Sequence, residues 1–432
     1  MNRAPASQPV ARATETLGMS AKSVHRPDSI SEIAARLAAR RARYDLASVA
    51  QRVLYDPALP AAAQHRTVWC HRAIKAESGK GHLWRRLDGS STRLTGVVTC
   101  GSVWTCPVCS ARVAEHRREE LERAMKFHCS AGGYVYLLTL TAPHEGDLAL
   151  ADFERLFTKA LQRFKNSKAF KSFSKTYQRA GSVRSLEITW GAEHGFHIHT
   201  HDLVFAAPGL ESDQRAIDAL RGAWIAVLLK VGLAPQSKVE WMWKRALDLR
   251  GGQRAADYVN KFGHDAKWGI TAEVTRSHAK VGMREVCGHK DHVTPFQMLA
   301  WAEKGDAEAA SLFREFAAVF SGKRMLYWSP HLKAKMGIVD VDDAEVAAGE
   351  KPRPEEREVA EFDAAQLALI VSRRALGELC EYVCLLSDGD PPHVQACVDD
   401  FLAELRTRPP LSRGTVRQKA WRLPEYYEVE PV

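Results

Sequence analysis

The sequence predicts an α+β fold in which helices cover one face of an antiparallel sheet. Between residues 131 and 270, short apolar runs of strand length alternate with longer segments of helical period. The runs are bounded by glycine and proline, as in "GGYVYLLTLTAP", which stops at Pro143. Their order, β-α-β-β-α-β, is typical of a split βαβ unit, a ferredoxin-like layer of helices on one antiparallel sheet.

The elements of this segment follow from local patterns. β-branched and aromatic residues mark the strands, and apolar residues three and four apart mark the helices. A turn at Pro208-Gly209 separates the two halves, and Gly263 ends the last helix. In chain order we expect a strand at 132–143, a helix at 150–167, strands at 183–190 and 196–205, a helix at 212–232, a strand at 237–243 and a short helix at 253–263.

Composition shifts divide the rest of the chain. The first 27 residues are small and polar, and a basic helix is expected from 28 to 54, with its cap near Asp28 to Ser31. Residues 339–361 are acidic and contain proline, which favours a linker. We expect a disordered and basic helical segment at 1–65, a zinc-binding module at 66–130, the sheet domain at 131–270, a helical extension at 271–338, the acidic linker at 339–361 and a helical tail at 362–432.

Charge and composition restrict the class of protein. The 432 residues carry a formal net charge of +9, which favours a polyanionic partner such as nucleic acid over a merely basic protein. No apolar run reaches the roughly 18 to 20 residues of a membrane span, and the N-terminal stretch lacks the apolar core of a secretory signal. We therefore expect a cytoplasmic protein with reduced thiols. No GxxxxGK[ST] loop is present, so any ATP-driven step would belong to a partner.

Three histidines alternate along one predicted strand. In "GFHIHTHDLVF", His197, His199 and His201 fall on one face because a strand has a period of two. Glu187, in the preceding strand, is placed to add a carboxylate. Two histidines and a carboxylate would leave open metal positions for substrate and water. A set of purely structural histidines is the alternative interpretation.

A tyrosine and a lysine follow on the short predicted helix. Tyr258 and Lys261 in "AADYVNKFG" are three residues apart and share a helix face. A phenol has a pKa of about 10 and attacks only a polarised target, which a metal acting on a phosphate oxygen provides. The nearby lysine would favour phenolate. Alone, Tyr258 would more often be a packed aromatic residue, and the histidine face favours the catalytic interpretation.

The segment "CGSVWTCPVC" predicts most of the ligands of a structural zinc site. Cys106 and Cys109 form a CPxC turn, and Cys100 supplies a third thiolate. The fourth ligand would be Cys70 or His71, and buried free thiols are the alternative. The helix that follows the cysteines carries candidate phosphate contacts. These are Arg112, Arg117 and Arg118.

Together these features resemble the single-tyrosine HUH endonucleases, specifically the rolling-circle replication initiators of small bacterial plasmids. "YLLTLTAP" is similar to the family's first motif, "HIHTHDLVF" to its metal motif and "DYVNK" to its Tyr-x-x-Lys motif; "GKRMLYWSPHLKAKMG" is similar to the stretch that follows. A CPxC element before the first motif is also common in the family. The resemblance covers about residues 95–335.

The resemblance implies a mechanism and its partners. Mg or Mn, held by the histidines and Glu187, would polarise one phosphate of single-stranded or hairpin origin DNA. Tyr258 would attack and leave a 5′-phosphotyrosyl enzyme and a free 3′-OH that primes synthesis. A host helicase and a DNA polymerase are the expected partners. The ester would later be transferred to rejoin the ends.

The sequence departs from the family pattern at several positions. Ile198 replaces a proline, and Asp202 replaces an apolar residue. The pair His197 and His199 and the pair His199 and His201 both remain open as ligands. Arg254 stands where a glutamate often activates water at termination, and Asp257 is a candidate substitute.

Two further groups of residues have open interpretations. Trp241, Trp243 and Trp268 either pack in a core or stack on unpaired bases. The ligand types in "CGHKDHVTP" have a spacing that fits no standard metal site, which favours a solvated or DNA-facing loop.

Three other functions compete with the replication initiator. A zinc-dependent DNA-binding regulator without catalysis would leave the histidines and Tyr258 unexplained. A two-histidine, one-carboxylate iron oxygenase would give the basic charge no role. An HUH transposase or relaxase would use the same chemistry, although most relaxases place the tyrosine before the histidines.

Overall fold

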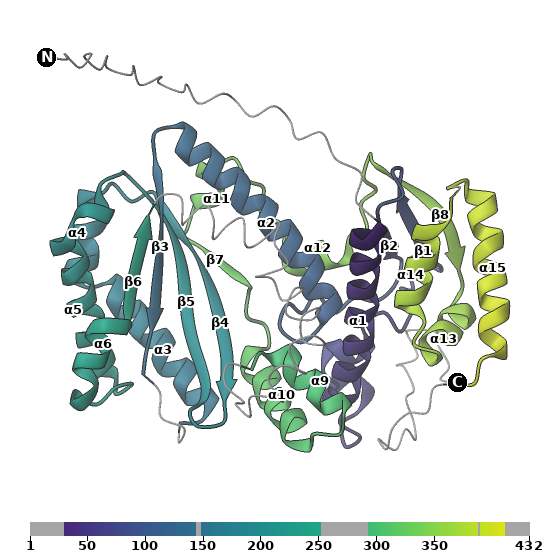
Figure 1. The fold of residues 1–432 in the computed structure, drawn as a ribbon, viewed down its shortest axis with the longest axis horizontal. Helices are drawn as coiled ribbons and strands as arrows, with labels where there is room; N and C mark the ends of the chain where they lie inside the picture. Colours follow the sequence, from purple (N-terminus) through teal and green to yellow (C-terminus); the bar gives the residue numbers. More distant parts are fainter. Residues whose placement is uncertain (1–29, 144–147, 252–292, 388, 411–432) are drawn as a thin grey trace, which may run out of the picture.

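The computed structural model describes residues 30–143, 148–251, 293–387 and 389–410 (Figure 1). Its main sheet has five strands in the order β6-β3-β5-β4-β7, and each neighbouring pair is antiparallel. The strands are β3 (Tyr134–Thr141), β4 (Gly181–Gly191), β5 (Gly195–Ala206), β6 (Leu247–Gly251) and β7 (Leu326–Trp328). The predicted α+β class with an antiparallel sheet is confirmed.

Helices form a layer on one face of this sheet (Figure 1). They are α3 (Leu150–Lys165), α4 (Lys168–Thr176) and α5 (Gln214–Val231). The apolar residues of α3 recur three and four apart, and Phe153, Phe157 and Phe164 are at most 2% exposed. Trp224 of α5 packs edge-on against Phe157 and Phe164. Its indole N–H donates to the Thr141 carbonyl at 2.9 Å, which ties the helical layer to β3.

The predicted strand at 237–243 is wrong. This segment forms the helix α6 (Val239–Arg245), and the strand β6 begins two residues later. Val239, Trp241 and Trp243 alternate as in a strand, but the fully buried residues are Met242 and Ala246. With the half-buried Val239 they repeat at i, i+3 and i+7, which is the period of one helix face.

Further helices lie at the β4 and β7 side of the sheet (Figure 1). Helix α2 (Pro107–Ser130) starts at the cysteine segment, where the Cys106 side chain accepts the N–H of Cys109 and Pro107 occupies the first turn. The other helices on this side are α1 (Ile30–Leu54), α9 (Pro295–Glu303), α10 (Ala307–Phe320) and α11 (Leu332–Lys335). Residues 293–335 are mainly helical.

A second, smaller sheet has its own core. Its order is β2-β1-β8, with strands β1 (Gly81–Arg86), β2 (Thr92–Thr95) and β8 (Glu356–Phe362). Leu83, Leu94 and Phe362 are at most 1% exposed and pack with residues of the C-terminal helices. Those helices are α13 (Ala364–Ser372), α14 (Leu376–Leu385) and α15 (Pro391–Thr407). The expected helical tail is thus part of a packed unit that includes the β1–β2 hairpin.

The segment 339–361 is not a linker. It contains α12 (Asp343–Ala348) and most of β8, which pairs with β1. Its acidic residues have structural partners: Asp342 caps α12, and Glu356 bonds Arg93 of β2 at 2.6 Å with both side chains at most 10% exposed. Acidic residues of this segment therefore pair with basic residues of the β1–β2 hairpin, which lies more than 250 residues earlier in the chain.

Among the described residues, no helix combines the length and apolar character that a membrane crossing requires.

Candidate functional site

The register of β4 and β5 brings two histidines to one carboxylate. Glu187 lies directly opposite His199, and His201 lies two residues along the same face. The Glu187 Oε2 atom is 2.8 Å from His199 Nε2 and 2.9 Å from His201 Nε2. The three side chains are 11 to 24% exposed, so they are sheltered but open to a small ligand. We call Glu187, His199 and His201 the histidine–glutamate group.

Two threonines of β3 hold the neighbouring imidazoles. Thr139 Oγ1 is 3.0 Å from His201 Nδ1, which directs Nε2 of that ring toward Glu187. Thr141 Oγ1 is 2.6 Å from His197 Nε2. Glu187 therefore meets His199 and His201, and His197 faces Thr141. The sequence interpretation assigned no role to these threonines, although both lie in the quoted "YLLTLTAP" motif.

The donor atoms fit a divalent metal ion. Octahedral ligands at about 2.1 Å from a cation lie about 3.0 Å from one another when adjacent, close to the two Glu187–histidine distances. Burial favours the neutral form of Glu187, but hydrogen bonds from His199 and His201 outweigh it and lower its pKa to about 2. The carboxylate is therefore ionised and available as a ligand at neutral pH.

Within the part of the chain that the structure describes, α2 covers one end of the histidine-bearing face. At that end, Val135, Leu137 and Phe205 are at most 7% exposed. The α2 residue His128 packs edge-on against Phe205 and approaches the Ala206 carbonyl at 3.1 Å. The histidine–glutamate group lies toward the opposite end of this face.

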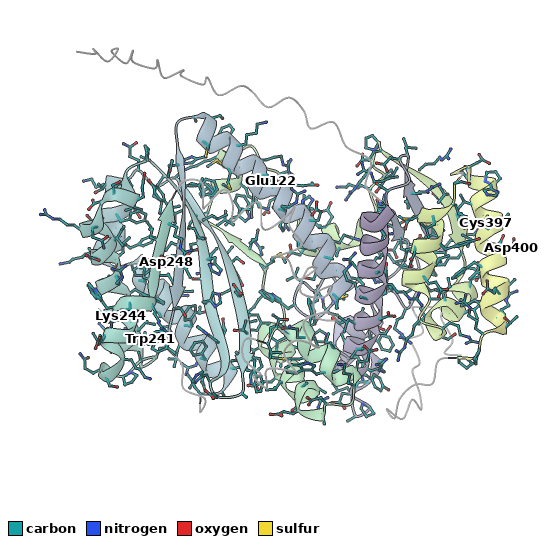
Figure 2. All side chains as sticks on the ribbon, viewed as in Figure 1. Glu122, Trp241, Lys244, Asp248, Cys397 and Asp400 are labelled. Carbon is teal, nitrogen blue, oxygen red and sulfur yellow. The ribbon has the colours of Figure 1, made fainter. Side chains whose placement is uncertain are left out.

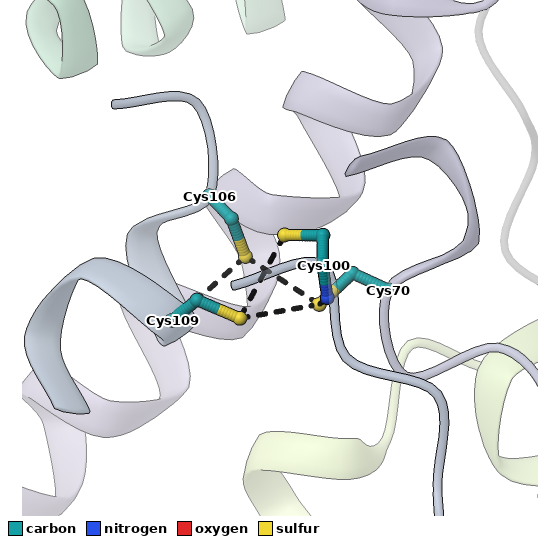
Figure 3. Close-up of side chains that lie close together, drawn as sticks. All are labelled: Cys70, Cys100, Cys106 and Cys109. Carbon is teal, nitrogen blue, oxygen red and sulfur yellow. Dashed lines mark hydrogen bonds between the residues drawn. The ribbon is translucent and has the colours of Figure 1, made fainter. Parts of the chain in front are cut away.

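Four cysteine side chains converge in the module that precedes the sheet (Figure 3). The sulfur of Cys70 is 3.5 Å from that of Cys109 and 3.7 Å from that of Cys106, and Cys100 lies 3.7 Å from Cys109. All four are at most 5% exposed. Of the two candidates for the fourth position, the structure brings Cys70 into the group, and His71 contacts Cys70 from outside it at 3.2 Å.

The sulfur distances fit one tetrahedral zinc ion. Zinc–sulfur bonds of about 2.3 Å place tetrahedral ligands about 3.8 Å apart, and backbone N–H groups of Cys100, Ser102 and Cys109 point at the sulfurs. Burial raises the pKa of the Cys70 thiol, so a bound cation would be needed to ionise it at neutral pH. The group has no open ligand position and suits a structural ion.

The three arginines expected to contact DNA have internal partners. Arg117 is 6% exposed and bonds Glu120 and Asp343 at 2.7 Å. Arg118 is 9% exposed and pairs with two glutamates of its own helix. Arg112 donates to the Ala347 carbonyl at 2.6 Å. Their positions therefore do not support the predicted phosphate contacts, because each guanidinium group already serves α2 or its junction with α12.

Several predicted site residues lie outside the described residues. They are Tyr258, Lys261, Arg254, Asp257, Trp268, Cys287, His289 and His292. The nucleophile and its lysine therefore remain predictions from the sequence.

Comparison with known proteins adds an independent observation. A family model described as "Replication protein" matches residues 91–219, which include the cysteines of the CPxC segment and the histidine–glutamate group. Residues 91–219 of the chain are thus similar to this replication-protein family.

Two similar proteins come from Streptomyces. "Protein rep" of Streptomyces lividans is 26% identical over 321 residues, which cover 61% of this chain and 69% of the relative. "Neomycin resistance protein" of Streptomyces cyanogenus is 26% identical over 171 residues, covering 33% of this chain and 38% of the relative. No solved structure matches. The family match and the first relative support a plasmid replication protein.

Proposed function

We propose that this protein initiates rolling-circle plasmid replication by nicking single-stranded origin DNA and transferring the strand. The observation that carries the proposal is the histidine–glutamate group, which lies within the residues that match the replication-protein family. In a replication protein that only binds DNA, two sheltered imidazoles that share an ionised carboxylate would have no function. Metal-assisted attack on a phosphate uses all three.

The proposed reaction exchanges one phosphodiester for another. The Tyr258 oxygen attacks the scissile phosphorus and forms a phosphotyrosyl ester with the 5′ end. The bond from phosphorus to the 3′ oxygen breaks, and that oxygen takes a proton to become the free 3′-OH. Because a phosphate ester is conserved, the DNA ends can later be rejoined without ATP.

The side chains of the site would prepare the phosphate for this attack. A bound Mg or Mn ion would neutralise and polarise a phosphate oxygen. Glu187 contributes the negative charge that retains a cation, and His199 and His201 contribute neutral nitrogens. Thr139 fixes the orientation of His201 through its other ring nitrogen. Lys261 would stabilise the phenolate form of Tyr258.

The cysteine group supports a separate, structural task. Cys70, Cys100, Cys106 and Cys109 would hold zinc and fix the first turn of α2 to the segment before the sheet. A cytoplasmic protein with this activity would act on single-stranded or hairpin origin DNA. The exposed 3′ end would then pass to a host helicase and DNA polymerase.

A covalent-trapping experiment tests the proposal. Labelled single-stranded oligonucleotides that tile the plasmid origin are incubated with the full-length protein and Mn or Mg, then run on a denaturing gel. We expect a metal-dependent covalent band that disappears in Tyr258→Phe and His199→Ala. His194→Ala, on the exposed turn that joins β4 and β5, should retain the band as a matched control.

Two outcomes would contradict the proposal. Tight DNA binding without a covalent band, with either metal and across the whole origin, would favour a non-catalytic replication regulator. A band that persists in Tyr258→Phe would show that another residue is the nucleophile.

A further inference from the structure

Helix α6 carries an exposed tryptophan at the β6 edge of the sheet. Trp243 is 45% exposed, whereas Trp241, two residues earlier, packs partly against the main core. A β-carbon on Gly222 of α5 would lie 3.8 Å from the Trp243 ring, so the indole rests over the small residue of the neighbouring helix. Trp243 thus contributes little to the core and keeps much of its aromatic surface in solvent.

One guanidinium group lies near each indole. The guanidinium of Arg221 lies 5.7 Å from the ring centre of Trp243, and that of Arg245 lies 5.9 Å from Trp241. Residues 238–250 contain four basic and two acidic side chains. The ion pair of Lys244 with Glu240 is 2.7 Å long, and both side chains are at least 68% exposed. Such exposed pairs contribute little free energy, so a phosphate can replace the carboxylate.

The end of α6 is joined to the strand that supports the histidines. The Ala246 carbonyl accepts the N–H of Thr141 at 3.0 Å, and Thr141 contacts His197. Trp243 precedes Ala246 by three residues, an axial rise of about 4.5 Å along the helix. Asp248 of β6 lies opposite Thr139, which contacts His201. Figure 2 shows Trp241 and Lys244 on α6, next to Asp248 on β6.

We propose that Trp243 is a stacking platform for an unpaired base of the DNA strand that crosses the β6 edge on its way to the histidine–glutamate group. This inference rests on the proposed function, since it assumes a single-stranded DNA substrate. Exposed aromatic rings bordered by cations suit single strands: each base offers a flat face to the ring, and the cations contact the phosphates. Stacking of this kind does not depend on base identity, so Trp243 would add affinity at the origin and elsewhere.

The test separates bases from phosphates. Binding of the full-length protein to a fluorescein-labelled 20-mer of thymidylate is compared with binding to a 20-mer of abasic residues, which keeps the phosphates and lacks the bases. We expect Trp243→Ala to weaken binding of the thymidylate strand by about 5- to 100-fold and to leave abasic binding unchanged. Trp243→Phe should restore most of the affinity, because a smaller aromatic face remains.

Leu385→Ala provides a matched control, because Leu385 is 61% exposed on α14 of the small sheet domain. It should bind both strands as the wild type does. Equal thymidylate binding by Trp243→Ala and wild type would overturn the platform, and so would an equal loss on both strands. If the wild type forms no covalent complex with origin DNA, the nicking proposal fails, whereas the base-dependent effect of Trp243 can still be measured.

Discussion

Replacing Arg117 with methionine should destabilise the protein and leave its affinity for DNA unchanged. Arg117 links α2 to α12, since its guanidinium bonds Glu120 within α2 and both Asp343 and the Val341 carbonyl across the junction. Methionine retains the apolar stem and removes the charge and the hydrogen bonds. The Glu120 side chain is only 1% exposed, so a carboxylate would remain buried with one cation fewer.

The expected cost follows from the partners that remain. Loss of one member of a buried ion pair typically costs about 3 to 5 kcal/mol. Lys333 Nζ stays 3.2 Å from Glu120 Oε2, which places the expected cost at the lower end, about 3 kcal/mol. With an unfolding entropy of about 2.1 cal/mol/K per residue, a chain of this size should melt about 3 to 4 °C lower.

Differential scanning calorimetry and DNA binding at several salt concentrations measure the two effects. Arg118→Met is the matched control: its partners Glu115 and Glu122 are 56% and 37% exposed, so the cost should stay below about 1 kcal/mol. A residue that contacts a phosphate of a single strand would lower the salt slope by about 0.7 when removed. An unchanged melting temperature together with a lower salt slope in Arg117→Met would refute the reasoning.

Three further predictions concern the metal groups and the small sheet. Cys70→Ser should lose bound zinc, measured by native mass spectrometry, and Cys129→Ser, at an exposed cysteine of α2, should keep it. Thr139→Val should weaken Mn binding in calorimetry by about 10- to 100-fold, because His201 loses its orienting partner, whereas Thr158→Val on α3 should not. Truncation after residue 338 removes β8 and uncovers the apolar core that it shares with β1, so the product should aggregate; a stable monomer by size-exclusion chromatography would contradict this.

The histidine–glutamate group could be predicted because it depends on local rules. Strand alternation places His199 and His201 on one face, and the short β4–β5 connection leaves few possible registers for Glu187. The sequence alone could not show which two histidines lie against Glu187. That choice depends on Thr141, on a strand more than fifty residues earlier, which contacts His197.

The errors arose where long-range contacts override local patterns. Residues 339–361 have the composition of a linker, and only their pairing with β1 stabilises them as β8. Arg117 lies in a highly charged helical sequence that is typical of a solvent-exposed helix. Its burial depends on contacts such as the ion pair with Asp343 of α12. In α6, two tryptophans at a spacing of two resemble a strand, and the burial of Met242 decides for a helix.

Helix α2 connects the cysteine group to the histidine-bearing face. Cys106 caps its start, Cys109 lies in its first turn, and its last turn contains His128, which packs on Phe205 of β5. A helix of 24 residues is about 36 Å long, so it spans the distance between the two groups as one rigid element. An ion that fixes the start of α2 would therefore also hold its end over Phe205, at the end of the face away from the histidine–glutamate group. The match of one family model to both segments is consistent with this physical coupling.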